Sequence, residues 1–216
     1  RDSSKAYILD AVAHSLKRLQ TDYIDLYQLH GGTIEDPMDE TIEAFELLKD
    51  QGKIRAYGIS SIRPNVIREY VARSNIASVM MQYSLLDRRP EESCLELLRE
   101  NSIGVMVRGA VAKGLLVDKP PKAYLGYTLE EVRQMSNAVK QVSSYGSQGA
   151  TADRTQAQAA LQFVLQNQAV CSVVAGMRTK EQLKENVGAM DSSRLTSIDV
   201  RQLSLVLEPN IYSDHR

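Results

Sequence analysis

Five short apolar runs, each joined to the next by helical patterns, constrain the fold of this chain more than any other feature of its sequence. The runs span residues 23–30, 54–60, 76–82, 103–108 and 170–175. Between them, apolar residues recur at helical spacing, as Ile8, Val12 and Leu16 do in the first helical pattern. Strands that alternate with helices form parallel sheets with right-handed crossover connections. The sequence therefore predicts an α/β fold.

The helical patterns begin at recognisable signals. Asp2 or Ser3 can cap the first helix, and Pro64 and Pro90 suit the first turn of a helix. We expect helices over residues 5–19, 39–51, 64–73, 90–101, 129–142, 154–166, 180–189 and 197–207, with loops over residues 109–128 and 143–152.

Composition and charge exclude several classes of protein. The 216 residues suit a single domain over residues 1–216, and 26 basic against 27 acidic residues leave a net charge of −1. A broad basic field for nucleic acid is therefore not expected. No apolar run reaches the roughly 20 residues that cross a bilayer, and no signal peptide is evident. Cys94 and Cys171 lack metal-ligand spacing, so we expect a cytoplasmic protein with reduced thiols and no metal.

His30 ends the first apolar run and is the first candidate for chemistry. In a barrel of parallel strands, catalytic groups lie at the C-terminal ends of the strands. A histidine there can donate a hydrogen bond or relay a proton near neutral pH. The alternative is a histidine that caps the strand and bonds only to backbone.

Polar residues also follow the second and third runs. Ser60 and Ser61 can bond a ligand amide, although serines in a turn commonly bond the turn itself. Gln82 can make two hydrogen bonds to an amide, or it can satisfy neighbouring backbone. Tyr83 offers a ring for stacking or for packing in the core. None of these residues is specific by itself.

Residues 175–186 carry a stronger signal. Gly176 permits close approach to the backbone, and the following helix offers free N–H groups at its positive end. The Arg178 guanidinium matches a phosphate in geometry. Gln182 and Asn186 are four residues apart, so they share one helix face and could read a base edge. The alternative is a capped amphipathic helix with a solvated polar face.

Taken in order, these segments resemble the aldo-keto reductase family, and in particular its bacterial members with short loops. The resemblance covers residues 15–189 and rests on matches at residues 25–30, 44–60, 82–84, 113–116 and 173–186. It implies a (β/α)8 TIM barrel that reduces aldehydes or ketones with a nicotinamide cofactor, usually NADPH. The family lacks the glycine-rich dinucleotide fingerprint, which this chain also lacks.

The resemblance implies a role for each matching residue. His30 would orient and polarise the substrate carbonyl beside a catalytic tyrosine. Ser60, Ser61 and Gln82 would hold the nicotinamide carboxamide. Further cofactor contacts would come from Arg108 at the nicotinamide ring, from Gly109, Val111, Lys113, Gly114 and Leu115 along the pyrophosphate, from Gly176, Arg178 and Thr179 near the adenosine 2′-phosphate, and from Gln182 and Asn186 at the adenine.

Two positions depart from the family pattern. The family usually has asparagine where Ser61 stands, and serine has a shorter reach to the carboxamide. Many members place an aromatic ring where Arg108 stands. An arginine can stack through its planar guanidinium, but its charge would alter the nicotinamide as a hydride donor.

The family's catalytic tetrad of Asp, Tyr, Lys and His is represented here only by His30. The other three residues belong to the first three strand ends, which would precede Arg1. A closed barrel typically needs about 250 residues, so the chain is short by about three β-α units. We expect that the first three strands are missing and that the chain alone is inactive.

The sequence thus predicts an NADPH-dependent aldo-keto reductase acting on a small-molecule carbonyl, with His30 beside a tyrosine outside this chain. One alternative is an NADPH-binding regulatory or partner subunit without turnover, which Arg108 favours. Another is a truncated chain, either degenerate or completed by a partner. The sequence does not indicate the substrate or the oligomeric state.

Overall fold

The computed structural model describes residues 2–145 and 153–216 of the chain. Its strands form one parallel sheet in the order β1-β2-β3-β4-β5, with β1 and β5 at the edges. The strands are β1 (Ile24–His30), β2 (Ile54–Ser60), β3 (Ser78–Gln82), β4 (Gly104–Arg108) and β5 (Val170–Val174). The α/β fold with a parallel sheet is therefore confirmed.

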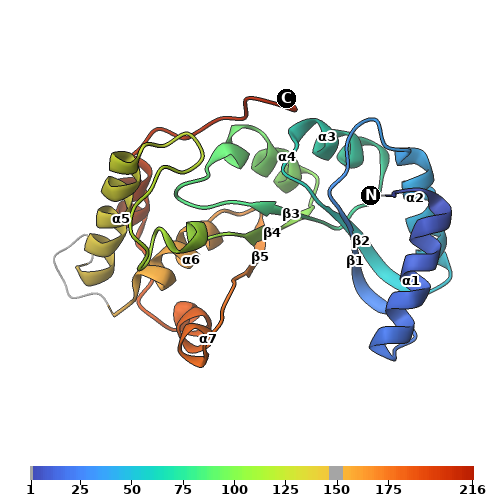
Figure 1. Cartoon of the computed structure of the whole chain (residues 1–216), viewed down its shortest axis with the longest axis horizontal. Helices are drawn as coiled ribbons and strands as arrows, with labels where there is room; N and C mark the ends of the chain where they lie inside the picture. The colour runs from blue at the N-terminus through green and yellow to red at the C-terminus, as the bar shows by residue number, and fades with distance from the viewer. Residues whose placement is uncertain (1, 146–152) are drawn as a thin grey trace.

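The helices follow the outer side of the curved sheet, from α1 at one end to α7 at the other (Figure 1). They are α1 (Lys5–Leu19), α2 (Met38–Asp50), α3 (Pro64–Arg73), α4 (Cys94–Glu100), α5 (Leu129–Ser144), α6 (Gln156–Leu165), α7 (Lys180–Val187) and α8 (Ser197–Ser204), with 3-10 helices η1 (Arg89–Glu92), η2 (Ala112–Gly114) and η3 (Gly188–Met190). Within the described ranges, no helix combines the length and the apolar character that crossing a membrane requires.

The predicted cap of the first helix and the predicted single helix over residues 90–101 are both wrong. The cap of α1 is Ser4, whose hydroxyl accepts from the Tyr7 N–H, rather than Asp2 or Ser3. The Asp2 carboxylate instead accepts from the backbone N–H of Ser4 at 2.8 Å. The helix expected over residues 90–101 is divided into η1 and α4, because Ser93 lies between them with a φ of −159° that no helix accommodates.

Other bounds move by a few residues, for local reasons. The first residue of α6 is Gln156, since Thr155 caps this helix in a capping box with Gln158. The predicted loop over residues 109–128 contains η2. Of the loop predicted over residues 143–152, residues 143 and 144 finish α5, and residues 146–152 lie outside the described residues.

The two faces of the sheet differ in chemistry. Toward the helices, side chains such as Tyr57, Ile59 and Val79 have no exposed surface. The opposite face is small and polar near its centre, where the Gln28 amide donates to the Ser78 hydroxyl at 3.0 Å. A Cβ on Gly58 would lie 2.4 Å from the Ser78 carbonyl oxygen, so β2 and β3 require glycine at this point. One face therefore forms the core, and the other leaves room at the strand ends.

Candidate functional site

The parallel register places four of the predicted residues at the C-terminal ends of the strands, on the same side of the sheet. His30 pairs with Ser60, and Gln82 pairs with Arg108, each at the last position of its strand. Backbone bonds extend this alignment beyond the strands, since the Gly31 N–H donates to the Ser60 carbonyl at 2.8 Å. Because parallel strands end at the same edge, residues far apart in sequence meet where a ligand can reach them.

A hollow of about 270 Å³ opens beside His30. It is lined by His30, Gly31, Gly32, Ser60, Ser61, Ile62, Arg63 and Arg108. The His30 side chain is exposed to it, and two guanidinium groups contribute positive charge. None of the eight lining residues is acidic. The hollow therefore suits a ligand that carries hydrogen-bond acceptors or negative charge.

Gln82 makes three hydrogen bonds to the protein itself. Its Nε2 donates to the Asp87 carboxylate at 2.8 Å and to the Tyr124 hydroxyl at 3.1 Å. Its Oε1 accepts from the Arg108 guanidinium at 2.9 Å. Both amide N–H groups are thus engaged, and one lone pair of Oε1 remains for a ligand. Gln82 can still accept from a carboxamide, but it cannot also donate to one in this arrangement.

Three residues that the sequence analysis did not select support Gln82. Asp87 is fully buried, and Arg89 binds it through two hydrogen bonds of 2.7 and 2.9 Å. A carboxylate can only accept, so Asp87 sets which end of the Gln82 amide faces Arg108. Burial raises the pKa of Tyr124, which keeps its phenol protonated near neutral pH. Asp87 and Arg89 directly follow the segment that carries Gln82, a signal that sequence reasoning could have used.

Arg63 is another residue that the sequence analysis missed. It lines the hollow, and its guanidinium donates to the Gly32 carbonyl at 2.8 Å, so it ties the loop after His30 to the start of α3. The Ser61 hydroxyl accepts from the backbone N–H of Arg63 at 3.1 Å. Ser61 therefore stabilises its own turn, while no side-chain hydrogen bond to Ser60 occurs within residues 2–145 and 153–216.

The predicted pyrophosphate segment is a tight loop after β4. Gly109 has a φ of 74°, and a Cβ there would lie 3.2 Å from the Gln82 side chain, so the position favours glycine. Lys113 is exposed, whereas Leu115 is buried in the core. The Leu115 side chain therefore packs inward, and only its backbone is available for a ligand. Val111 is half-buried against the same core, and Gly114 has a φ of 93°.

The predicted phosphate segment forms the start of α7. Thr179 caps the helix by accepting from the Gln182 N–H at 3.2 Å, and the Gln182 Oε1 accepts from the Arg178 N–H at 2.7 Å. Arg178 is exposed, and a Cβ on Gly176 would meet nothing within 4 Å. Gln182 therefore helps to cap α7, which leaves its Nε2 for a base, while Asn186 is half-buried one turn further along.

His30 and Arg178 belong to opposite ends of the sheet. His30 ends the edge strand β1, whereas Arg178 follows the other edge strand, β5, with three strands between them. A single ligand that contacts both residues must therefore extend across the C-terminal ends of all five strands.

A larger hollow, of about 560 Å³, lies between α4, α6 and α8. Its charged lining is already paired, since Arg88 and Tyr83 both donate to the Glu91 carboxylate. It is lined neither by His30 nor by any of the predicted cofactor residues, so we place the candidate site at the smaller hollow beside His30.

Comparisons with known proteins bear on the family of this chain. The model of the aldo/keto reductase family matches residues 1–208. An uncharacterised oxidoreductase of Bacillus subtilis (strain 168), YqkF, is 52% identical over 100% of this chain and 70% of its own length. The NADH-specific methylglyoxal reductase of Escherichia coli (strain K12) is 31% identical over 88% of this chain and 61% of its own length. The solved holo form of the aldo-keto reductase AKR11C1 from Bacillus halodurans is 50% identical with a TM-score of 0.89, and the match covers 100% of this chain and 69% of that one.

Proposed function

The chain belongs to the aldo/keto reductase family, and on that basis we propose that it provides the cofactor site and the catalytic histidine of a carbonyl reductase that uses NADPH. The observation that carries this proposal is that His30, Ser60, Gln82 and Arg108 end four adjacent parallel strands, with His30 paired to Ser60 and Gln82 paired to Arg108. The substrate would be a small aldehyde or ketone.

The residues at this edge fit a nicotinamide dinucleotide. The Ser60 hydroxyl and the Gln82 Oε1 can bond a carboxamide, and the exposed Arg178 can pair with a phosphate. The open space beside Gly176 leaves room for a ligand to approach the backbone. When bound, the cofactor supplies the hydride. The protein contributes by holding the cofactor at remote points, so that the reacting atoms are aligned.

His30 is exposed in the hollow and can donate a hydrogen bond to the carbonyl oxygen of a substrate. Such a bond orients the carbonyl and stabilises the negative charge that develops on its oxygen. Protonation of that oxygen is assigned to a tyrosine outside this chain, as the family resemblance implies.

The preference for NADPH depends on Arg178. Only NADPH carries the 2′-phosphate, and a guanidinium at the start of α7 is suited to bind it. The name of the Escherichia coli relative specifies NADH for that protein. We propose NADPH for this chain because Arg178 is exposed and makes no ion pair within residues 2–145 and 153–216.

We further propose that the five strands correspond to five of the eight strands of a TIM barrel, within one domain. The support is the 0.89 TM-score over 69% of a solved aldo-keto reductase. The resemblance assigns the Asp, Tyr and Lys of the tetrad to the other three strands of the barrel, and no residue of this chain is assigned to those roles.

The test is carbonyl-dependent oxidation of NADPH by the natural protein that contains this chain, followed at 340 nm. Turnover that requires both NADPH and an aldehyde would support a reductase. NADPH binding without turnover for a panel of aldehydes and ketones would overturn it in favour of a regulatory or partner subunit, the role that Arg108 also allows.

A further inference from the structure

Helix α7 carries the proposed adenosine contacts, yet none of its residues is buried. A surface helix of ordinary amphipathic type is held by an apolar face against the core. In α7 that face is poorly covered, since Leu183 is 45% and Val187 63% exposed. Its orientation must therefore depend largely on contacts other than apolar burial.

The first such contact comes from Gln158 on α6. Its Nε2 donates at 3.1 Å to the carbonyl of Glu185, which lies in the last turn of α7. Carbonyls in the last turn of a helix have no acceptor role within the helix and need a donor from elsewhere. A Cβ on Gly188 would lie 3.0 Å from the same Nε2, so glycine at the end of α7 leaves room for this bond.

The second contact comes from Gln162, one turn further along α6 and buried. Its Nε2 donates to the carbonyl of Ala189 at 2.8 Å, directly after α7, and to the Ser192 hydroxyl at 3.1 Å. Its Oε1 accepts from the N–H of Leu195 at 2.9 Å. Gln162 thus makes hydrogen bonds near the beginning and near the end of the segment that connects α7 to α8.

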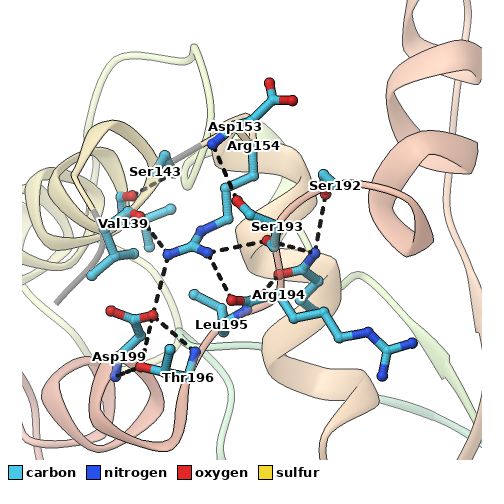
Figure 2. Close-up of polar contacts among 12 residues, drawn as sticks. Val139, Ser143, Asp153, Arg154, Ser192, Ser193, Arg194, Leu195, Thr196 and Asp199 are labelled. Atoms are coloured by element: carbon cyan, nitrogen blue, oxygen red, sulfur yellow. Dashed lines mark hydrogen bonds and ion pairs between the residues drawn. The ribbon is translucent and has the colours of Figure 1, made fainter. Parts of the chain in front are cut away.

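Arg154, two residues before α6, bonds to the same segment, as Figure 2 shows. Its side chain is 2% exposed and donates to the carbonyls of Ser193 and Arg194 at 3.1 and 3.0 Å. It also pairs with the buried carboxylate of Asp199 at 3.2 Å, and that carboxylate accepts from the Thr196 N–H. The segment from α7 to α8 is therefore hydrogen-bonded to Arg154 and Gln162 at several residues.

We propose that Gln158 and Gln162 on one face of α6, together with Arg154 just before it, are positioning residues that set the orientation of α7 and thereby the affinity for the adenosine end of the cofactor. The proposal rests on the proposed function, because it requires that Arg178 on the segment opening α7 binds the cofactor. The three positioning side chains, spaced four residues apart, form a polar ladder. Its hydrogen bonds hold α7 in place, as apolar burial does for other helices.

The sharpest test is Gln158→Glu in the natural protein that contains this chain. Glutamate keeps the oxygen that accepts from the Thr155 N–H at 2.9 Å, so the capping box of α6 remains. It loses the donor to Glu185 and places a carboxylate against that carbonyl. We expect the Kd for NADPH to rise about fivefold, with kcat at saturating NADPH and the thermal midpoint nearly unchanged.

Gln166→Glu is the matched control. Gln166 lies four residues after Gln162 and donates to the carbonyl of Leu195 at 2.9 Å, and within the described residues its side chain makes no hydrogen bond to α7. The substitution adds the same negative charge, so a general electrostatic effect on an anionic cofactor would appear in both variants. We expect its Kd for NADPH to change less than twofold. Equal weakening in the two variants would overturn the positioning role.

Two further variants separate this proposal from the proposed function. Gly188→Ala narrows the space for Gln158 and should weaken NADPH in the same direction without altering charge. Arg178→Ala tests the phosphate contact itself. Loss of affinity in Arg178→Ala together with wild-type affinity in both Gln158→Glu and Gly188→Ala would refute the ladder alone, whereas wild-type affinity in Arg178→Ala would refute the adenosine site.

Discussion

The two faces of the sheet are built from alternate residues of the same strands, yet they differ in almost every property. Toward the helices, Ile59, Val79 and Val105 have no exposed surface. On the other face, His30 and Arg108 are exposed at the strand ends. Successive side chains point to opposite faces of a strand. A single register therefore places apolar packing on one side and hydrogen-bonding groups on the other.

The difference shows that stability and chemistry are separated here by one residue. Ile59 and Ser60 are neighbours in β2, but the first is in the core and the second lines the hollow beside His30. A shift of register by one residue would move Ser60 into the core and Ile59 to the hollow, so that both the packing and the candidate site would be lost. Substitutions on the two faces should therefore have different effects.

The largest expected effect is on the helix-facing side. Ile59→Ala leaves a cavity among fully buried side chains and should lower the free energy of unfolding by about 3 kcal/mol. Ser60→Ala, one residue away, should change it by less than about 0.5 kcal/mol. Denaturant unfolding of both variants measures the contrast. Equal losses would mean that both faces contribute to the core.

The next effect is on the ligand-facing side. His30→Ala should lower kcat for carbonyl reduction by the natural protein about 100-fold, because a positioned hydrogen-bond donor to the carbonyl oxygen is lost. The Kd for NADPH should stay near the wild-type value, since His30 is assigned to the substrate. Steady-state kinetics and cofactor titration provide the two measurements. Collapse of NADPH binding would instead assign His30 to the fold.

A smaller effect is expected beyond the edge strand β5, where Arg178 lies. Arg178→Ala should weaken NADPH about tenfold through loss of the phosphate contact. NADH, which lacks the 2′-phosphate, should bind with nearly unchanged affinity and serves as the internal control. Cofactor titrations compare the two. If both cofactors weaken equally, Arg178 supports α7 rather than the phosphate.

The last prediction concerns the reactivity of the two cysteines and requires no substitution. Cys94 is buried in α4, and burial raises its pKa to about 11, so its thiol stays protonated at pH 8. Cys171 on the edge strand β5 is exposed. A thiol reagent added to this chain at pH 8 should therefore label Cys171 rapidly and Cys94 only on unfolding, as mass spectrometry of the digested chain would show. Labelling of both at one rate would indicate that the helix layer opens in the native state.

Much of the fold could be predicted from the sequence. The bounds of α1, β2 and α3 agree with the expectation, because apolar spacing, Pro64 and the strand run are local signals. The divided helix at η1 and α4 was missed, since Ser93 carries no strong helix-breaking signal. The strand-end residues were also found, because the end of an apolar run is visible without a structure.

The surroundings of these residues were less predictable. Gln82 is bonded by Arg108, 26 residues away, and by Tyr124, 42 residues away. No periodicity in the sequence relates such distant pairs, so Tyr124 was not selected. The polar ladder of α6 was missed for a similar reason, since its acceptors are backbone carbonyls whose position depends on how α6 and α7 pack.

The sequence by itself determined the order of strands and helices, the end of each strand to within one residue and the residue types available there, because these follow from hydrophobic periodicity and local backbone preferences. Only the tertiary structure decided that the Gln82 amide donates to Asp87, and that α7 is held by hydrogen bonds from Gln158 and Gln162 rather than by burial of apolar side chains. Those outcomes depend on which groups meet across the packed layers, where each buried donor or acceptor must find a partner.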